Sequence, residues 1–264
     1  MRTMRTVLAA ILFAASAVLS PVQATSFSTD QSDLWWVPTE SGWGMQLVQR
    51  GSVIFATVFV YNNVGVPYWF YAVLNNVSGT PVWTGQASAN MGPYYGAAAF
   101  DPGAVTAAAI GNLTWTSTSV NNGRLDYTAF GVTVSKNMTR QTLVLENFTG
   151  VYGGGVHQVA TACSNPLNNG TTDVFTGFQI IQTGTAINIT SQSATLICTY
   201  TGTYAQSGQM GNSVGSYSCS NGDGGTFAFI ESQVTISGFS SRFSTNSTMS
   251  GCQTTGNVAG VRSQ

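Results

Sequence analysis

Charge is what this sequence has least of. Only 6% of its 264 residues are charged, against about a quarter in a typical soluble domain. The formal net charge is −1, so the chain has no excess of Lys and Arg with which to replace the counterions of a phosphate backbone. This composition excludes nucleic acid as a partner and disfavours binding to an anionic membrane surface. Solubility must come from hydroxyl and amide side chains.

Histidine is nearly absent as well. The chain has one, His157, and a His-based catalytic triad or metal site would have to use it. No nucleophile elbow, zinc-protease helix or phosphate-binding glycine loop accompanies it. The nine acidic residues are scattered, mostly in turn-like segments where a carboxylate caps backbone amides. We predict no catalytic residue, no metal site and no cofactor. A hydrolase using Glu40 or His157 is the weaker alternative.

Long hydrophobic runs are missing after the first residues. Gly, Ser, Thr and Asn interrupt every later apolar stretch, and none reaches the about 18 residues of a membrane-spanning helix. We expect no transmembrane helix. The beginning differs, because Arg2 and Arg5 precede an apolar run from Val7 to Leu19 and a small-residue tripeptide that ends at Ala24. This pattern is typical of a secretory signal peptide. We predict a signal over residues 1–24, cleavage near Ala24, and export to the periplasm or the medium.

The rest of the chain has the pattern of an all-β protein. Short segments of β-branched and aromatic residues alternate with polar ones and are separated by Gly, Asn and Pro turns. Short turns favour antiparallel pairing of neighbouring strands, and closure into a barrel hides the sheet edges. We predict two tandem antiparallel up-and-down β-barrel or sandwich domains. The first, aromatic-rich, covers residues 25–146, and the second, which contains the cysteines, covers residues 147–264.

The individual strands can be placed roughly from the same alternation. In the first domain we expect them near residues 43–50, 52–61, 66–75, 80–88, 106–117, 123–132 and 134–143. In the second domain we expect them near residues 148–154, 174–182, 185–191, 195–205, 213–220, 225–231, 233–238, 241–248 and 256–262.

All four cysteines lie in the second half of the chain, and in an exported protein an even number of cysteines indicates disulfides. Three pairings are possible. A hairpin centred near Gly208 and Gln209 places Cys198 opposite Cys219, so we favour that bridge and, by elimination, Cys163 with Cys252. The bridge between Cys163 and Cys252 would tie the first strand region of the domain to the last. A four-cysteine zinc site is disfavoured because the chain has no CxxC pair.

Aromatic residues are abundant at the start of the first domain. The segment from Leu34 to Tyr71 holds four of the six tryptophans. Their flat apolar faces suit stacking on sugar rings or apolar ligands. Alternate residues of a strand share a face, so Trp69 and Tyr71 should point the same way. A strand with aromatic residues on both sides places one set in the core and leaves the other exposed or at an interface.

Glu40 lies in a tight turn surrounded by tryptophans. A partly buried carboxylate there must be paired or hydrogen-bonded several times. Arg140, Arg124 and Arg50 are the partners that the first domain offers. The ion pair would pin the turn, or the carboxylate would orient a ligand beside the aromatic rings. The candidate ligand-binding residues are Trp35, Trp36, Glu40, Trp43, Trp69 and Tyr71.

The segment Trp35 to Gly44 resembles a group of exported bacterial proteins that share a WWxPxESGWG signature. The similarity continues through residues 55–69 and more weakly through residues 123–127 and 136–140. Departures are Val37, where an Asn is common, and Asn62, where an Asp is common. The resemblance implies bacterial export and a β fold but no catalytic residues, because no activity is established for the group. The second domain is similar only in general plan to avidin-like and lipocalin-like barrels.

We therefore predict an exported, non-enzymatic protein that binds a glycan or a small apolar ligand through the first-domain aromatics. The alternative is a cell-surface structural or interaction protein that assembles with itself or a partner through exposed aromatic strands. Burial separates these functions. An open concave aromatic cleft favours ligand binding, a flat exposed patch favours assembly, and fully buried tryptophans favour a structural role.

Overall fold

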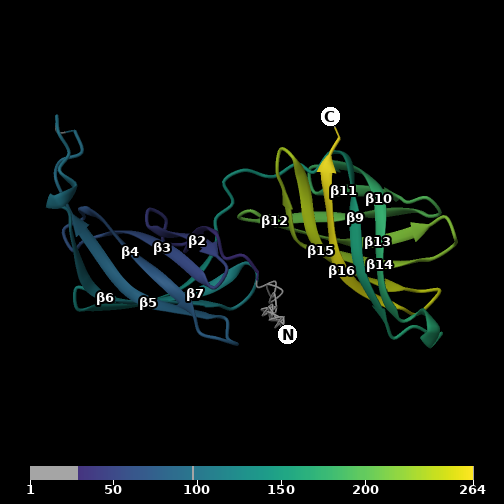
Figure 1. Cartoon of the computed structure of the whole chain (residues 1–264), viewed down its shortest axis with the longest axis horizontal. Coiled ribbons are helices and arrows are strands. Elements are labelled where there is room, and N and C mark those ends of the chain that lie inside the picture. Colours follow the sequence, from purple (N-terminus) through teal and green to yellow (C-terminus); the bar gives the residue numbers. More distant parts are fainter. Residues whose placement is uncertain (1–28, 97, 264) are drawn as a thin grey trace, which may run out of the picture.

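The computed structural model describes residues 29–96 and 98–263. It contains two antiparallel β-barrels of eight strands each, in tandem along the chain and side by side in space (Figure 1). The predicted all-β fold with two tandem antiparallel barrels is confirmed. Residues 1–24, the predicted signal peptide, lie outside the described residues. In the part of the chain that the structure describes, no helix is long and apolar enough to cross a membrane.

Barrel 1 is built from the first eight strands, each paired with the next, and is closed by pairing of the first with the eighth. Its elements are β1 (Asp33–Trp36), β2 (Gly44–Arg50), β3 (Val53–Tyr61), β4 (Pro67–Asn76), β5 (Val82–Met91), the 3₁₀ turn η1 (Pro102–Ala104), β6 (Thr106–Ser117), β7 (Asn122–Ala129) and β8 (Val132–Arg140).

Barrel 2 repeats this plan and is closed by pairing of its first and last strands. Its elements are β9 (Gly150–Thr161), the 3₁₀ turn η2 (Pro166–Asn168), β10 (Gly170–Thr183), β11 (Ala186–Gln192), β12 (Ile197–Ser207), β13 (Met210–Cys219), β14 (Gly224–Val234), β15 (Gly238–Ser247) and β16 (Gln253–Arg262).

Two of the strand predictions were wrong. No strand was predicted at the position of β1, which has only four residues yet pairs with both β2 and β8. The strands predicted near residues 225–231 and 233–238 are instead one strand, β14. Its register shifts between Ile230 and Gln233, and Glu231 has a φ of +56°. This β-bulge interrupts the alternation, so one strand has the pattern of two.

The interior of barrel 1 is densely filled. The Trp35 and Trp115 rings meet edge to face, with their centroids 4.6 Å apart. Gly123 makes room for this pair, since a Cβ there would come within 2.1 Å of the Trp115 ring. Of the twelve largest fully buried side chains among the described residues, ten belong to barrel 1. Barrel 1 therefore has a packed core of the kind that eight strands allow.

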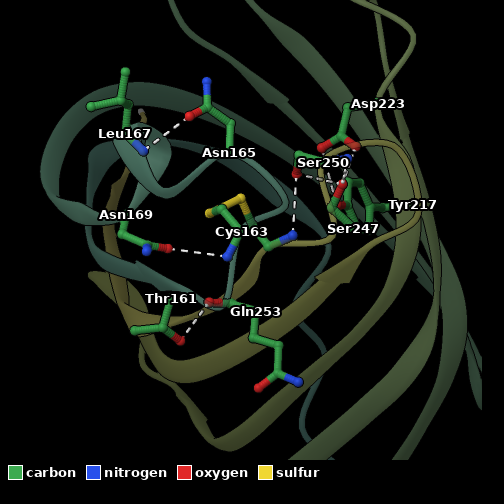
Figure 2. Close-up of a disulfide and its surroundings, with 11 residues drawn as sticks. Thr161, Cys163, Asn165, Leu167, Asn169, Tyr217, Asp223, Ser247, Ser250 and Gln253 are labelled. Atoms are coloured by element: carbon green, nitrogen blue, oxygen red, sulfur yellow. Dashed lines mark hydrogen bonds between the residues drawn. A yellow bond between two sulfur atoms is a disulfide. The ribbon is translucent and has the colours of Figure 1, made fainter.

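Both predicted disulfides are present. Cys198 and Cys219 face each other across β12 and β13, and Cys163 is bonded to Cys252. Both bridges lie at the end of barrel 2 where β9 ends and β16 begins. Figure 2 shows Cys163 there, with its backbone N–H donating to Asn169 Oδ1 at 3.1 Å. The bridges covalently tie the strand ends that lie away from barrel 1.

A buried ion pair within barrel 1 also contacts barrel 2. The side chains of Arg140 and Asp33 are almost completely buried and lie 3.0 Å apart, and the guanidinium stacks on Trp35 with 4.6 Å between Cζ and the ring centroid. Asp33 Oδ2 also accepts from the backbone N–H of Gln209, in the β12–β13 turn, at 2.8 Å. Gly208 precedes it with a φ of +60°, and a Cβ there would collide with the Asp33 carboxylate. The β12–β13 turn of barrel 2 thus lies directly against buried residues of barrel 1.

Candidate ligand-binding site

The candidate residues predicted from the sequence lie in different environments. Trp35 is 1% exposed and belongs to the core of barrel 1, whereas Trp36, next to it on β1, is half-buried. Trp43 packs against the core from a half-buried position. Trp69 and Tyr71 share the outer face of β4, where Trp69 is 49% exposed. Trp35 is thus separated from the outer pair by the barrel wall.

Glu40 forms an ion pair, but its partner is none of the arginines considered. Lys136 Nζ lies 2.8 Å and 2.9 Å from the two carboxylate oxygens, and Trp43 Nε1 donates to Oε2 at 3.1 Å. The hydrogen bond from Lys136 lowers the pKa of Glu40. Arg140 is occupied by Asp33 instead. These contacts hold the β1–β2 turn against β8, which is the pinning role expected of a paired carboxylate.

An outer aromatic face forms on β3 and β4 of barrel 1, and we define it as Phe55, Phe59, Trp69 and Tyr71. Phe59 and Trp69 are cross-strand partners. Phe55 and Tyr71 stack with centroids 5.7 Å apart and ring planes at 26°, while Trp69 and Tyr71 lie 6.4 Å apart at 34°. The rings thus make a row of similarly inclined surfaces on the outside of the barrel, not the wall of a cleft.

His157 is placed on the outer surface of barrel 2. It faces Asp173 across β9 and β10, with Nδ1 and Oδ1 2.7 Å apart. Both side chains are largely exposed, at 53% and 79%. No serine or cysteine hydrogen-bonds to His157 within residues 29–96 and 98–263. A solvated pair of this kind contributes little to stability, and no nucleophile stands beside it that would complete a triad.

The interior of barrel 2 contains a cavity of about 140 Å³, which sequence reasoning did not identify. Its wall is mostly aliphatic and aromatic, with a few hydroxyls and one amide. The lining residues are Phe148, Val156, Gln158, Val174, Thr176, Phe178, Ile180, Ile187, Ile189, Ser191, Ser193, Leu196, Cys198, Tyr200, Tyr204, Ser213, Phe229, Ser232, Phe239, Ser241, Phe243 and Val258.

Small residues at inward positions keep this barrel hollow. Serines 191, 213, 232 and 241 line the cavity, where barrel 1 has tryptophan, leucine and methionine. Gly202 and Gly215 also pair directly across β12 and β13 and contribute no side chain to the interior. An eight-stranded barrel has room for either a complete set of side chains or one small ligand. The small inward residues of barrel 2 do not fill its interior, and a cavity remains.

The end of the cavity nearest barrel 1 is covered by the linker between the barrels. Phe148 is 3% exposed and meets Tyr204 edge to face at 5.4 Å. Its carbonyl accepts from the Tyr152 hydroxyl at 2.8 Å, and its N–H donates to Gln182 Oε1 at 3.0 Å. At the other end the cavity is bordered by the β11–β12 turn through Ser193 and Leu196. The linker thus serves as one lid of the cavity.

The chemistry of the cavity is neutral. None of its lining residues is an Asp, Glu, Lys, Arg or His. Burial raises the pKa of Tyr204 to about 12, and its hydroxyl donates to Gln206 Oε1 at 3.0 Å. Burial also raises the pKa of Tyr200. A charged ligand would be left without a counter-ion in this wall, whereas an uncharged apolar molecule would be in van der Waals contact on every side.

The sequence did contain a signal for this cavity. Along β12 to β15 the positions that alternate with the exposed ones carry Phe, Tyr, Gly and Ser, whereas in barrel 1 they are mainly aliphatic residues and Trp. Using that signal requires knowing which residues share one interior. That knowledge comes from the register of all eight strands.

The comparisons with known proteins do not assign the chain to a family. No protein-family model and no curated protein matches it. Among solved structures, the crystal structure of a protein described as a "putative outer membrane protein" from Bacteroides fragilis aligns with 87% of this chain and 95% of that one, at 12% identity and a TM-score of 0.33. At this similarity the match bears on neither the detailed fold nor the function.

Proposed function

We propose that this is an exported binding protein that holds one small, neutral, mainly apolar molecule inside barrel 2. The observation that carries the proposal is the cavity of about 140 Å³ with no charged residue in its wall. Apolar protein cavities of about 150 Å³ stay dry and take up benzene or xenon. The expected ligand is therefore one ring or a short chain of similar size. The sequence predicts a small apolar ligand on the aromatics of the first domain. In the present proposal it lies inside the second barrel instead.

Export is supported by the two disulfides, because such bonds persist in oxidising compartments and are rare in the cytosol. The signal-like pattern of residues 1–24 points the same way. An exported carrier of an apolar molecule needs a rigid container. The bridges supply part of that rigidity at the far end of barrel 2.

Benzene tests the proposal because it matches the cavity in size and has no polar group. A ligand that binds only the folded state raises the melting temperature as its concentration rises above its dissociation constant. We expect benzene to stabilise the wild-type protein. It should not stabilise Ile189→Phe, which places a ring in the cavity. Ile181→Phe is the matched control, since Ile181 is 49% exposed on the outside of β10.

Two results would contradict the proposal. One is the absence of any benzene-dependent shift or heat of binding in the wild type. The other is equal binding by wild type and Ile189→Phe, which would place the benzene elsewhere.

The outer aromatic face of barrel 1 supports a second candidate, binding of a glycan chain. Phe55, Phe59 and Trp69 are exposed and Tyr71 is half-buried. The rings are similarly inclined and set in a row, and Tyr71 Oη donates to Asn90 Oδ1 at 3.2 Å. Sugar rings stack on such surfaces. The same face would also suit self-association, the alternative function. Trp69→Ala should abolish retention on a polysaccharide column if the face binds glycans, and it should convert an oligomer to a monomer in sedimentation if the face assembles. No effect in either measurement would refute both.

A further inference from the structure

The bulge in β14 changes which side chain faces the cavity. Phe227 and Phe229 point into barrel 2, and regular alternation would bring Glu231 inside next. Instead Glu231 takes a φ of +56° and the register shifts there. Its carboxylate lies toward Arg242 Nη1, at 3.2 Å, and toward Thr29 Oγ1, at 2.8 Å. A positive φ at a residue other than Gly is costly and often marks a functional site. The bulge removes a charge from the interior and puts Ser232 in its place.

The hydroxyl of Ser232 is held in a defined orientation. Ser232 is 6% exposed, and its Oγ lies 2.8 Å from Ser241 Oγ on β15. Ser241 Oγ also lies 2.8 Å from the carbonyl oxygen of Arg242 and 3.1 Å from that of Ile230. A hydroxyl has one hydrogen to donate. When Ser241 donates its own to a backbone carbonyl, Ser232 donates to Ser241 and keeps its lone pairs free to accept a hydrogen bond.

Ser213 lies close to this pair on β13 and is only 3% exposed. It lines the cavity, yet its hydroxyl has no hydrogen-bond partner among the residues that the structure describes. The register pairs Gly211 with Ser232 and Ser213 with Phe229, with a shift between the two pairs, so Ser213 and Ser232 are neighbours on adjacent strands. The Ser213 hydroxyl borders the cavity, so it is free to form a hydrogen bond with a molecule inside.

We propose that Ser213 and Ser232 recognise one hydroxyl group on the cavity's ligand, with Ser213 donating to its oxygen and Ser232 accepting its hydrogen. This inference rests on the proposed function of barrel 2 and makes it more specific. The ligand class becomes a small neutral alcohol or phenol with an apolar body. The body contacts the Ile and Phe side chains of the wall, and the hydroxyl lies against β13 and β14. Ser241 is a positioning residue that orients Ser232.

Phenol and benzene form the matched probe pair, because they differ by one hydroxyl. Their affinities for the full-length mature protein are measured by titration calorimetry or by ligand-observed NMR. We expect Ser213→Ala to weaken phenol about tenfold, which corresponds to the loss of about one buried hydrogen bond. Benzene should change by no more than about twofold. Ser232→Ala should act in the same direction, and Ser218→Ala, on the exposed face of the same strand as Ser213, should change neither affinity.

The outcomes separate this inference from the function on which it rests. If benzene binds but phenol does not, or if Ser213→Ala leaves the ratio of the two affinities unchanged, the hydroxyl site is refuted and the apolar cavity stands. If neither molecule binds the wild type, the cavity function itself fails. Melting temperatures of the serine variants show whether each one is folded before its affinities are compared.

Discussion

The two barrels share strand number, strand order and mode of closure, yet one is filled and the other is hollow. In barrel 1 the edge-to-face pair of Trp35 and Trp115 occupies the interior together with Leu, Ile and Met side chains. In barrel 2 five serines line the interior, four of them on strands, and Gly202 and Gly215 add no side chain to it. The comparison teaches that eight antiparallel strands set the size of the interior, and the volume of the inward side chains decides what remains of it. The inward side chains, and not the number of strands, therefore decide what a barrel can bind.

The barrels also differ in how they are stabilised. Barrel 1 contains no cysteine and depends on its packed core and on the buried pair of Asp33 and Arg140. Barrel 2, with its looser core, is crosslinked twice at its far end. A cavity forfeits van der Waals attraction that a full core would have, and crosslinks offset part of that loss by restricting the unfolded chain. Four measurements would break or sharpen this contrast.

Reduction of the disulfides should have the largest effect. The bridges span 89 and 21 residues, and loops of such lengths contribute about 3 to 5 kcal/mol each in the chain-entropy model. All six tryptophans lie in barrel 1, so tryptophan fluorescence reports on barrel 1 and far-ultraviolet circular dichroism on both. With reductant we expect an early transition by dichroism and an almost unchanged one by fluorescence. A single transition lowered equally by both probes would show that the barrels unfold as one unit.

Truncation of matched isoleucines tests the packing difference itself. Ile54 is 0% exposed in barrel 1, and Ile187 borders the cavity in barrel 2. Ile→Ala costs about 2 to 5 kcal/mol, depending on how tightly the side chain was packed and on the void that remains. We expect Ile54→Ala near the top of that range and Ile187→Ala near the bottom, because Ile187 already faces empty space on one side. Denaturant unfolding measures both. Equal costs would mean that the cavity wall is as well packed as the full core.

Alkaline pH should affect barrel 2 next. Burial, reinforced by nearby acidic groups, raises the pKa of both Tyr204 and Tyr217 from 10 to about 12. A group whose folded-state pKa is raised stabilises the fold fully below its unfolded pKa and loses that contribution as pH rises through the folded pKa. Barrel 2 should therefore lose stability between pH 10 and 12, by on the order of 1 to 3 kcal/mol per tyrosine. Tyr217→Phe should flatten the decline. An unchanged slope in that variant would assign the loss to other groups.

The smallest effect is expected at the ion pair of Glu40 and Lys136. Both side chains are more than a third exposed, Glu40 at 38% and Lys136 at 35%, and exposed pairs are weak and screened by salt. The hydrogen bond from Lys136 lowers the pKa of Glu40, so the contribution is present above the unfolded value and fades as pH falls through the lowered one. We expect Glu40→Gln to shift the melting temperature slightly at pH 7 and by less at pH 3. A large loss of stability in Glu40→Gln would show that barrel 1 depends on the β1–β2 turn far more than an exposed ion pair allows.

Much of the architecture could be predicted because it is set by local pattern. Alternation of period two marked most strands, and Cys198 and Cys219 could be paired by counting from a hairpin centre, since residues of a regular hairpin face each other at equal distances from its turn. Prediction failed where the pattern is short or broken. β1 has four residues, and the bulge at Glu231 depends on a backbone conformation that no neighbouring residue specifies.

The candidate site could be predicted only in part. Trp69 and Tyr71 do share an outer face, as period two requires. Trp35, one residue from Trp36, is instead in the core. The partner of Glu40 is Lys136, 96 positions along the chain. The sequence offered several cations for Glu40, and the register between strands decided among them.

By itself, then, the sequence determined the strand content, the pairing of the cysteines and the scarcity of charge, because each follows from composition or from neighbours along the chain. The tertiary structure alone decided that barrel 2 is hollow and that Ser213 faces the void unpaired. The reason is that an interior is the sum of inward side chains from eight strands. Their volumes meet only when closure of the barrel brings distant segments together.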